Sequence, residues 1–271
     1  MTPLALLQHF DTGTIWPGGP GASGCADLAS AYQTALAVRA LRMARGEQPR
    51  GYKIGFTNRT IWQRYQVFAP IWGTVWDSTL SFDDNDDDGH AAAPLSLAGL
   101  CQPRIEPELV FGLRASPAIG AGLDGLFDAI DWVAPGFELV QSHQADWKFS
   151  APDTVADAGL HARLRVGRRV PLRQLAADAP ALDALLAGAT LTLHRDGQRI
   201  DQGTGTNVLD SPLRALLHFM NELRQCPGAP ALQAGDVITT GTWTDAWPVQ
   251  PGQHWRSDFT LPLPALSVVF E

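Results

Sequence analysis

Lysine is scarce in this sequence. Of the 20 basic residues only two are lysines, Lys53 and Lys148, and the rest are arginines. A lysine amine can lose its proton at an accessible free-energy cost whereas an arginine guanidinium cannot, so the retained lysines are candidates for acid-base chemistry. With numbers this small, chance is the alternative explanation.

Cysteine is also scarce, and its three copies are far apart. Cys25, Cys101 and Cys226 form no C-x-x-C pair and are odd in number. A disulfide framework and a zinc site are therefore not indicated, and the sequence favours a reducing, cytoplasmic location.

Long apolar runs and basic clusters are missing as well. Nowhere do 18 apolar residues follow one another, and Met1–Phe10 lack the basic segment of a secretory signal. The formal net charge is −8, which disfavours non-specific nucleic-acid binding. We therefore expect neither nucleic-acid nor membrane partners, and an anionic small-molecule substrate would need a local positive centre.

The remaining composition is that of a globular protein. The chain has 271 residues, of which 45% are hydrophobic, enough for one large core or a core with a small appendage. Helical patterns alternate with short strand patterns without a regular βαβ rhythm, which predicts an α+β fold on a rolled or sandwiched sheet. We expect residues 1–48 to form an N-terminal helical segment packed on the core, and residues 49–271 to form the main domain.

Several predicted elements have defined ends. Turn residues predict a hairpin at Asp196-Gly197. Apolar spacing predicts helices over Ala26–Arg45, Leu123–Val133 and Pro171–Ala187. Two further helices are predicted to follow caps, one over residues 59–66 after Thr57 and one from Asp210 to Arg224.

The stretch Arg104–Phe111 reads as a β-strand in which apolar residues alternate with acids. Because strand side chains alternate between faces, Glu106 and Glu108 project on the same side, about 7 Å apart at their Cα atoms. They could converge on one cation or both face water. The pattern alone favours a solvated edge strand, and Pro107 fits an edge because it donates nothing to a ladder.

A third acid lies within an otherwise apolar strand pattern, Phe137-Glu138-Leu139-Val140. A carboxylate so placed needs a partner. Three carboxylates on strands, without cysteine or histidine among them, form a ligand set that suits Mg²⁺ or Mn²⁺ better than Zn²⁺.

Three other polar stretches are ambiguous. Lys53 lies in a short strand, Gly51–Gly55, whose glycines leave room for a ligand near the backbone. Asp77 ends the aromatic stretch Ile71–Trp76, where it either caps a turn or faces a pocket. The acidic run Asp83–Asp88 lacks the glycine and closing glutamate of an EF-hand, which favours a solvated hairpin loop.

Taken together, these stretches resemble the fumarylacetoacetate hydrolase superfamily, in the branch of 2-hydroxypenta-2,4-dienoate hydratases and 4-oxalocrotonate decarboxylases. The resemblance runs from about residue 28 to the C-terminus. Its motifs occur in the family's order: Gly51-Tyr52-Lys53-Ile54-Gly55, Ile105-Glu106-Pro107-Glu108, Glu138-Leu139-Val140, Ala145-Asp146-Trp147-Lys148, Asp153-Thr154-Val155-Ala156-Asp157, Asn207-Val208-Leu209 with Pro212-Leu213, and Gly235-Asp236-Val237-Ile238-Thr239-Thr240-Gly241.

The resemblance implies a mixed β-sandwich or β-roll core with flanking helices and a homo-oligomeric enzyme. It also implies a divalent ion, Mg²⁺ or Mn²⁺, held by Glu106, Glu108 and Glu138. Lys53 is expected to work next to the substrate, and Asp77 matches an acid near it.

The chain departs from the family pattern at several positions. Ala158, Gly159 and Leu160 follow Asp157 where the hydratases commonly have Asn-Ala-Ser, and Asp210-Ser211 stand where Gly-His is usual. We expect a 2-hydroxydienoate with a substituent beyond C5, or its carboxylated relative. The predicted substrate-binding residues are His143, Lys148, Leu160, His161 and Thr240, although either histidine could instead have a structural role.

The resemblance leaves three reactions open. We favour hydration of a 2-hydroxy-2,4-dienoate to a 4-hydroxy-2-oxo acid, with Lys53 as acid-base group and Asp77 presenting water. Decarboxylation of a 4-oxalocrotonate-like 2-oxo-enedioate is the alternative. Hydrolytic C–C cleavage ranks lower, because no histidine for the usual His/Glu pair occurs between His9 and His90. A non-enzymatic binding module is the remaining possibility.

Overall fold

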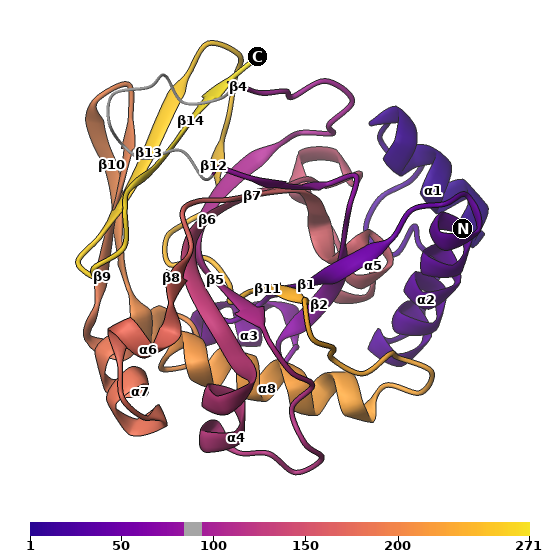
Figure 1. Ribbon diagram of the computed structural model, residues 1–271. Coiled ribbons are helices and arrows are strands. Elements are labelled where there is room, and N and C mark those ends of the chain that lie inside the picture. The colour runs from indigo at the N-terminus through magenta and orange to yellow at the C-terminus, as the bar shows by residue number, and fades with distance from the viewer. Residues whose placement is uncertain (84–93) are drawn as a thin grey trace.

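The computed structural model describes residues 1–83 and 94–271, and its centre is a curled mixed sheet (Figure 1). The predicted acidic loop at Asp83–Asp88 therefore lies almost wholly outside the described residues. In spatial order the sheet contains β2 (Ile71–Trp76), β1 (Pro49–Gly55), β11 (Val237–Thr239), β5 (Arg104–Leu113), β6 (Ile130–Val140), β7 (His161–Val166) and β3 (Leu80–Phe82), with β12 (Trp247–Pro248) beside β5 and β8 (Val170–Pro171) beside β6.

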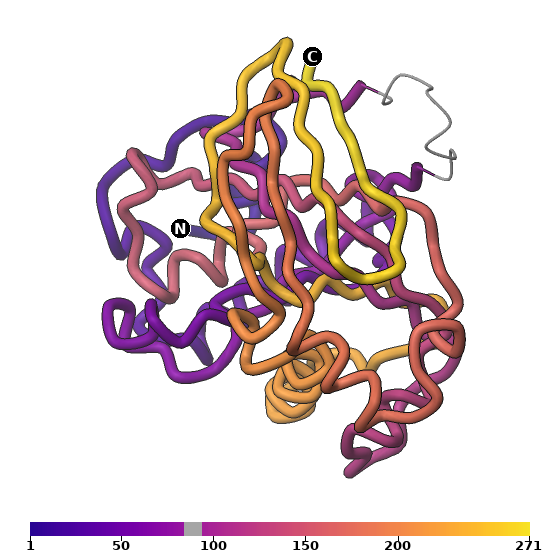
Figure 2. Tube along the Cα trace, turned by 90° about the vertical axis from the view of Figure 1, so that its left-hand side faces the viewer, coloured from indigo at the N-terminus to yellow at the C-terminus, as the bar shows by residue number. Residues whose placement is uncertain are grey.

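A second sheet packs as a separate layer against the first (Figure 2). Its strands are, in order, β10 (Gln198–Thr204), β9 (Thr190–Arg195), β13 (His254–Phe259), β14 (Leu266–Phe270) and β4 (Pro94–Leu95). Both sheets supply buried side chains to one core, among them Leu139 from β6 and Trp255 from β13. The predicted α+β fold with a rolled or sandwiched sheet is confirmed.

Strand β5 is central, which overturns the edge-strand interpretation. It pairs with β6 along its whole length. On its other side the ladder is interrupted, because β11 pairs with residues 110–112 and β12 with residues 104–105. Pro107 lies in this gap, where its carbonyl accepts a hydrogen bond from the Trp243 amide at 3.2 Å. A proline is tolerated inside the sheet here because no strand neighbour needs its missing N–H.

The helices lie in two groups around the sheets (Figure 1). One group contains α1 (Pro3–Thr12), α2 (Leu28–Ala44) and α5 (Ala151–Ala156), and the other α4 (Leu123–Ala129), α6 (Leu172–Leu175), α7 (Ala179–Gly188) and α8 (Pro212–Gln225). The short α3 (Trp62–Tyr65) follows a 3₁₀ turn. Helices α1 and α2 fall within residues 1–48, and the division of the chain at residue 48 stays a prediction.

Several element ends differ from those predicted, because local capping and strand pairing override apolar spacing. The helix after Gly122 ends at Ala129, where β6 begins, and the Pro171–Ala187 helix is two helices, α6 and α7. The caps are Asn58 instead of Thr57, and Ser211 instead of Asp210.

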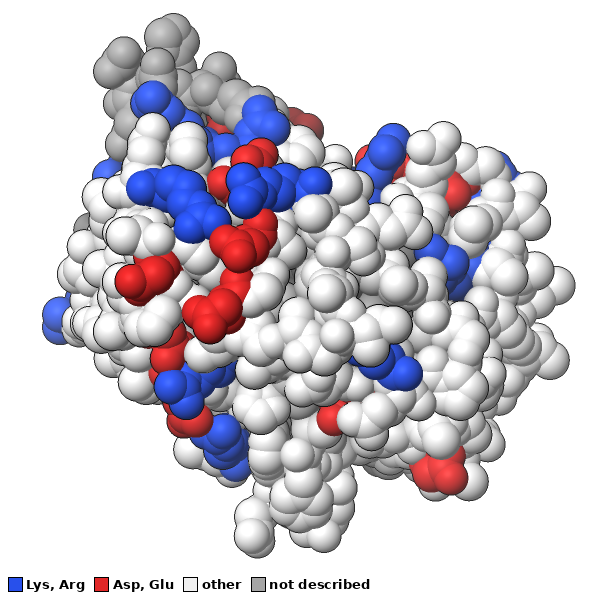
Figure 3. All heavy atoms as spheres, turned by 60° about the horizontal axis from the view of Figure 1, so that its bottom comes forward, with Lys and Arg blue, Asp and Glu red and all other residues white. Residues whose placement is uncertain are grey.

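Within the described ranges, no helix is long and apolar enough to cross a membrane. On the face in Figure 3, acidic and basic side chains are intermixed along one side and much of the rest is uncharged, without a continuous basic patch.

Candidate metal centre and active-site cavity

Three glutamates from two adjacent strands converge at the centre of the curled sheet. Glu106 and Glu108 lie on one face of β5, and Glu138 lies on β6 directly opposite Glu106 in the antiparallel register. One carboxylate oxygen from each lies within 4.8 Å of the others. Glu108 and Glu138 are fully buried. The alternation of β5 and the pairing with β6 thus build the cluster that the sequence predicted.

The three carboxylates of the cluster repel one another, and their pKa values are shifted. Burial, reinforced by the neighbouring carboxylates, raises the pKa of Glu106 to about 7 and that of Glu108 well above its ordinary value. Burial opposes ionisation of Glu138 too, but the Lys53 ammonium and a hydrogen bond from His161 outweigh it and hold the pKa of Glu138 below its ordinary value. Like charges at this distance favour either protonation or a bound cation.

The hydrogen bonds leave one oxygen of each buried glutamate open. The Gly241 amide donates to Glu108 Oε2 at 2.6 Å, and His161 Nδ1 donates to Glu138 Oε1 at 2.8 Å. Glu108 Oε1 and Glu138 Oε2 are buried and accept no hydrogen bond within the described part of the chain. Glu138 Oε2 faces the Lys53 ammonium, whereas Glu108 Oε1 has no such neighbour. Because a buried oxygen without a donor is rare, an all-oxygen site for a divalent cation fits these residues.

Lys53 is buried beside the cluster. It is 2% exposed on β1, and its Nζ lies 3.3 Å from Glu138 Oε2 and donates to the Gly159 carbonyl at 2.9 Å. Burial opposes its charge, but the three glutamates together outweigh burial and raise its pKa. Lys53 is therefore held as an ammonium group by the neighbouring carboxylates. The Gly51 position does not admit a ligand, because a Cβ there would come 1.9 Å from the β11 backbone oxygen of Val237.

The Gly159 carbonyl is presented to Lys53 by an unusual turn. Ala158, Gly159 and Leu160 all have positive φ, at 54°, 67° and 66°. Such a conformation costs on the order of 1–3 kcal/mol for each non-glycine residue. The turn lies against β2 at Gly73, where a Cβ would come 2.1 Å from the Ala158 oxygen. The close packing of this turn against β2 thus brings the Gly159 carbonyl within hydrogen-bonding distance of the Lys53 ammonium.

His161 holds one glutamate of the cluster in place. Its Nδ1 holds Glu138, and its Nε2 lies 2.9 Å from the Thr79 hydroxyl. Burial lowers the pKa of His161 and favours the neutral ring, in which Nδ1–H donates to the carboxylate and Nε2 accepts from Thr79. Both ring nitrogens are used, and the ring orients Glu138.

A cavity of about 300 Å³ opens onto the cluster. Lys53, Glu106 and Leu160 line it near the cluster. The rest of the lining is mixed. Aliphatic residues and glycines contribute to it, and so do aromatic, polar and charged residues: Phe56, Thr57, Asn58, Arg64, Tyr65, Arg104, Trp147, Phe149, Thr242, Thr244 and Asp245. Tyr65 and Phe149 stack with their ring centroids 5.5 Å apart.

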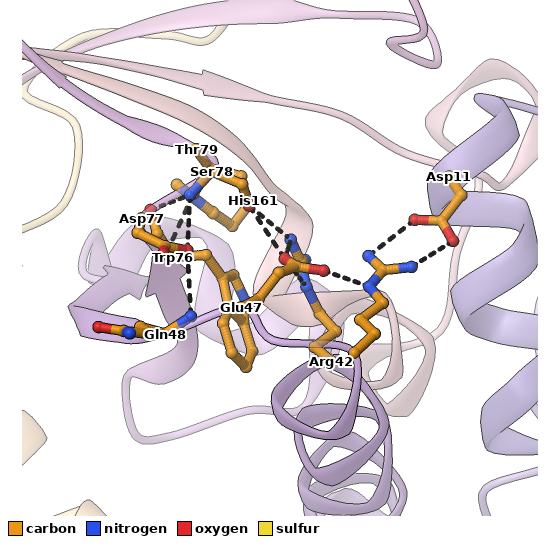
Figure 4. Close-up of polar contacts among 10 residues, drawn as sticks. Asp11, Arg42, Glu47, Gln48, Trp76, Asp77, Ser78, Thr79 and His161 are labelled. Atoms are coloured by element: carbon orange, nitrogen blue, oxygen red, sulfur yellow. Dashed lines mark hydrogen bonds and ion pairs between the residues drawn. The ribbon is translucent and has the colours of Figure 1, made fainter.

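Asp77 is not part of this cavity, which corrects its predicted role as the water-presenting group. It is exposed in the turn between β2 and β3, and Figure 4 shows it directed toward Gln48. Its carboxylate accepts from the Gln48 amide at 3.1 Å and the Ser78 amide at 2.9 Å. Asp77 therefore caps the turn, which is one of the two roles that the sequence allowed.

His143 also lies outside the cavity. Its Nδ1 is 2.6 Å from Asp157 Oδ1, its ring stacks on Trp16 at 6.1 Å, and its carbonyl accepts from the Trp16 amide at 2.7 Å. This buried pair anchors the loop after α1. A structural role, the second alternative for this histidine, fits the contacts.

Lys148 and Thr240 do not reach the cavity either. The Lys148 side chain is 73% exposed and faces Asp146. The Thr240 hydroxyl donates to the Leu109 carbonyl at 2.8 Å inside the sheet. Of the five predicted substrate-binding residues, Leu160 alone lines the cavity.

Other groups at the site are not among the predicted residues. Arg104 was overlooked although it shares the alternation of Glu106 and Glu108 and lines the cavity. The Gly159 carbonyl and the Gly241 amide are backbone groups, and no residue type in the sequence marks their role. Thr79 acts through His161, and nothing in its local sequence indicates that contact.

Comparison with known proteins gives the chain its relatives. It is 33% identical over 226 residues to 2-hydroxyhexa-2,4-dienoate hydratase from Comamonas testosteroni, covering 83% of this chain and 80% of the relative. It is 31% identical over 223 residues to a 4-oxalocrotonate decarboxylase from a Pseudomonas species, covering 80% of this chain and 77% of the relative. The chain belongs to this hydratase and decarboxylase family.

This membership confirms the resemblance to that branch of the fumarylacetoacetate hydrolase superfamily. No protein-family model matches the chain. Among solved structures, 4-oxalocrotonate decarboxylase from Pseudomonas putida G7, complexed with magnesium and adipate, superposes with a TM-score of 0.86 over 99% of this chain and 95% of its own. At 24% identity that likeness concerns the fold.

Proposed function

We propose that this protein is a divalent-metal-dependent hydratase that adds water to a 2-hydroxy-2,4-dienoate and yields a 4-hydroxy-2-oxo acid. The observation that carries the proposal is the cluster of Glu106, Glu108 and Glu138, with open oxygens on two of the three, at the floor of a cavity that also contains Lys53. Relatives named as hydratases in the same family support it.

The glutamates would hold Mg²⁺ or Mn²⁺. When bound, the cation supplies a Lewis acid for the carboxylate and the neighbouring oxygen of a 2-oxo acid. His161 and the Gly241 amide fix the two buried carboxylates, so these ligands are oriented before substrate arrives. The acid end of the substrate therefore points to the floor of the cavity.

Lys53 moves the proton in this scheme. The 2-hydroxyl proton of the dienol is lost and a proton is added at C5, which gives the 2-oxo-3-enoate. Water then adds across C3 and C4, with hydroxyl at C4 and hydrogen at C3. The Lys53 ammonium lines the cavity beside the acid end of the substrate, where it can donate the proton at C5, and the Gly159 carbonyl holds it in place.

Water is presented by the polar wall of the cavity, not by Asp77. Thr242, Thr244 and Asp245 line the cavity on the segment between β11 and β12. The alternative activity, decarboxylation of a 2-oxo-enedioate, would use the same acid end.

Proton NMR tests the choice between the two reactions. With a 2-hydroxydienoate and Mg²⁺, the proposal predicts a new carbinol proton at C4. If the dienoate is unchanged while a 2-oxo-enedioate releases carbon dioxide, the decarboxylase alternative replaces it. The cytoplasmic location and homo-oligomeric assembly are parts of the same proposal, and size-exclusion chromatography with light scattering tests the second.

A further inference from the structure

The cavity contains an arginine that nothing in the proposed chemistry uses. Arg104 begins β5 two residues before Glu106, so both side chains project on the same face and both line the cavity. Its guanidinium lies 4.2 Å from the centroid of the Trp147 ring. In the described ranges no hydrogen-bond acceptor approaches that guanidinium, although its side chain is partly buried.

Among the described residues no acceptor occupies the Arg104 guanidinium, so its donors are available to a ligand in the cavity. Arginine has five N–H donors in a fixed fork, and planar carboxylates satisfy two of them at once. Trp147 covers one face of the group by a cation–π contact but accepts no conventional hydrogen bond. Glu106 is the carboxylate whose charge acts most on Arg104, and the proposed metal would engage it.

The surroundings of Arg104 form a second end to the cavity. Trp147, Phe149 and Tyr65 form an aromatic wall beside it, and Arg64 adds a second, exposed guanidinium at the rim. Two residues along a strand are about 7 Å apart at the Cα level, so Arg104 lies one short carbon chain away from the metal-ligand end. The two ends face the same space.

We propose that Arg104 binds a second carboxylate at the far end of the substrate, so that this protein prefers a 2-hydroxydienedioate to a 2-hydroxydienoate with an uncharged tail. The inference rests on the proposed function, because it takes the acid end of the substrate to be held at the glutamate cluster. It also provides the local positive centre that an anionic substrate of this acidic protein needs.

The assignment bears on the reaction as well. A guanidinium that pairs with the far carboxylate stabilises the ground state of that carboxylate more than neutral carbon dioxide. Loss of that group as carbon dioxide is therefore disfavoured, and addition of water within the held chain is not. Arg104 thus favours hydration of a dicarboxylate over its decarboxylation.

Binding of two matched ligands tests the proposal without turnover. 2-Oxoadipate and 2-oxohexanoate share the 2-oxo acid end and differ in the far carboxylate. Isothermal titration of the Mn²⁺-loaded protein should show 2-oxoadipate binding between about tenfold and a hundredfold more tightly, as expected for a charge-assisted bidentate contact. Arg104→Met should abolish this preference and leave 2-oxohexanoate affinity within about twofold.

Two further variants complete the experiment. Arg104→Lys should retain part of the preference, because an ammonium keeps the charge but not the bidentate geometry. Arg199→Met removes an exposed arginine on β10, outside the cavity, and should leave the preference unchanged.

Equal binding of the two ligands by the wild-type protein, or a preference that survives Arg104→Met, would overturn the assignment. Metal-dependent binding of 2-oxohexanoate would then still support the proposed function. If neither ligand requires the metal, the proposed function fails instead.

Discussion

His161 and His143 each place ring Nδ1 against a buried carboxylate, at 2.8 Å from Glu138 and at 2.6 Å from Asp157. Both rings are almost completely buried. The two pairs differ in the contacts of the second carboxylate oxygen. Glu138 has a second oxygen open toward the glutamate cluster and Lys53, whereas Asp157 uses its second oxygen to accept from the His143 amide at 2.9 Å.

A buried histidine–carboxylate pair is therefore not by itself a functional signal. The pair becomes functional when its carboxylate retains an open oxygen in a cavity. His161 supports a candidate metal ligand, and His143 supports the loop that carries Trp16. The predictions that follow separate groups that line the cavity from groups that act through others and from groups that stabilise the fold.

The largest effect is expected at Lys53, which lines the cavity. Lys53→Met should lower kcat by roughly 10²- to 10⁴-fold, the usual contribution of general acid-base catalysis, while Mn²⁺ affinity stays near normal. Steady-state kinetics with a 2-hydroxydienoate measure the first and titration the second. Wild-type turnover by a folded variant would show that Lys53 is not the proton donor.

A smaller effect is expected at His161, a positioning residue. His161→Leu removes the hydrogen bond that orients Glu138, and loss of such an outer contact typically weakens metal binding or activity by about 10- to 100-fold. Mn²⁺ titration of the metal-depleted variant is the readout, since a merely structural histidine would not alter it. An unchanged dissociation constant for Mn²⁺ would show that His161, like His143, has only a structural role.

The matched change His143→Leu should act on stability and leave the chemistry alone. It leaves the buried Asp157 carboxylate without its ring partner, and unsatisfied buried groups of this kind cost about 1–3 kcal/mol, more when they are charged. Urea denaturation should show the lower free energy of unfolding, with kcat of the folded protein within about twofold of wild type. A large fall in kcat at unchanged stability would contradict the comparison.

The same comparison shows what could be predicted from the sequence. The glutamates on β5 were predictable because strand alternation fixes a face, and an isolated acid in an apolar strand signalled Glu138. Their convergence depends on the register that sets Glu106 opposite Glu138, which no local pattern encodes.

Other parts of the site depend on tertiary contacts. Asp77 follows a buried strand, but the hydrogen bonds of its turn direct it to Gln48 and away from the cavity. The left-handed turn at Ala158–Leu160 arises from close packing against Gly73, so the role of the Gly159 carbonyl had no sequence signal. Arg104 had one, the shared alternation with Glu106, and it was overlooked.

The central claim is that Glu106, Glu108 and Glu138 together bind one divalent cation. Titration of Mn²⁺ into metal-depleted protein, followed by electron paramagnetic resonance, tests it directly with Glu106→Gln, Glu108→Gln and Glu138→Gln. We expect one site in the wild type and strongly weakened binding in each variant, because each change removes a formal charge from an oxygen-rich site. Unchanged titration curves in all three variants would contradict the account.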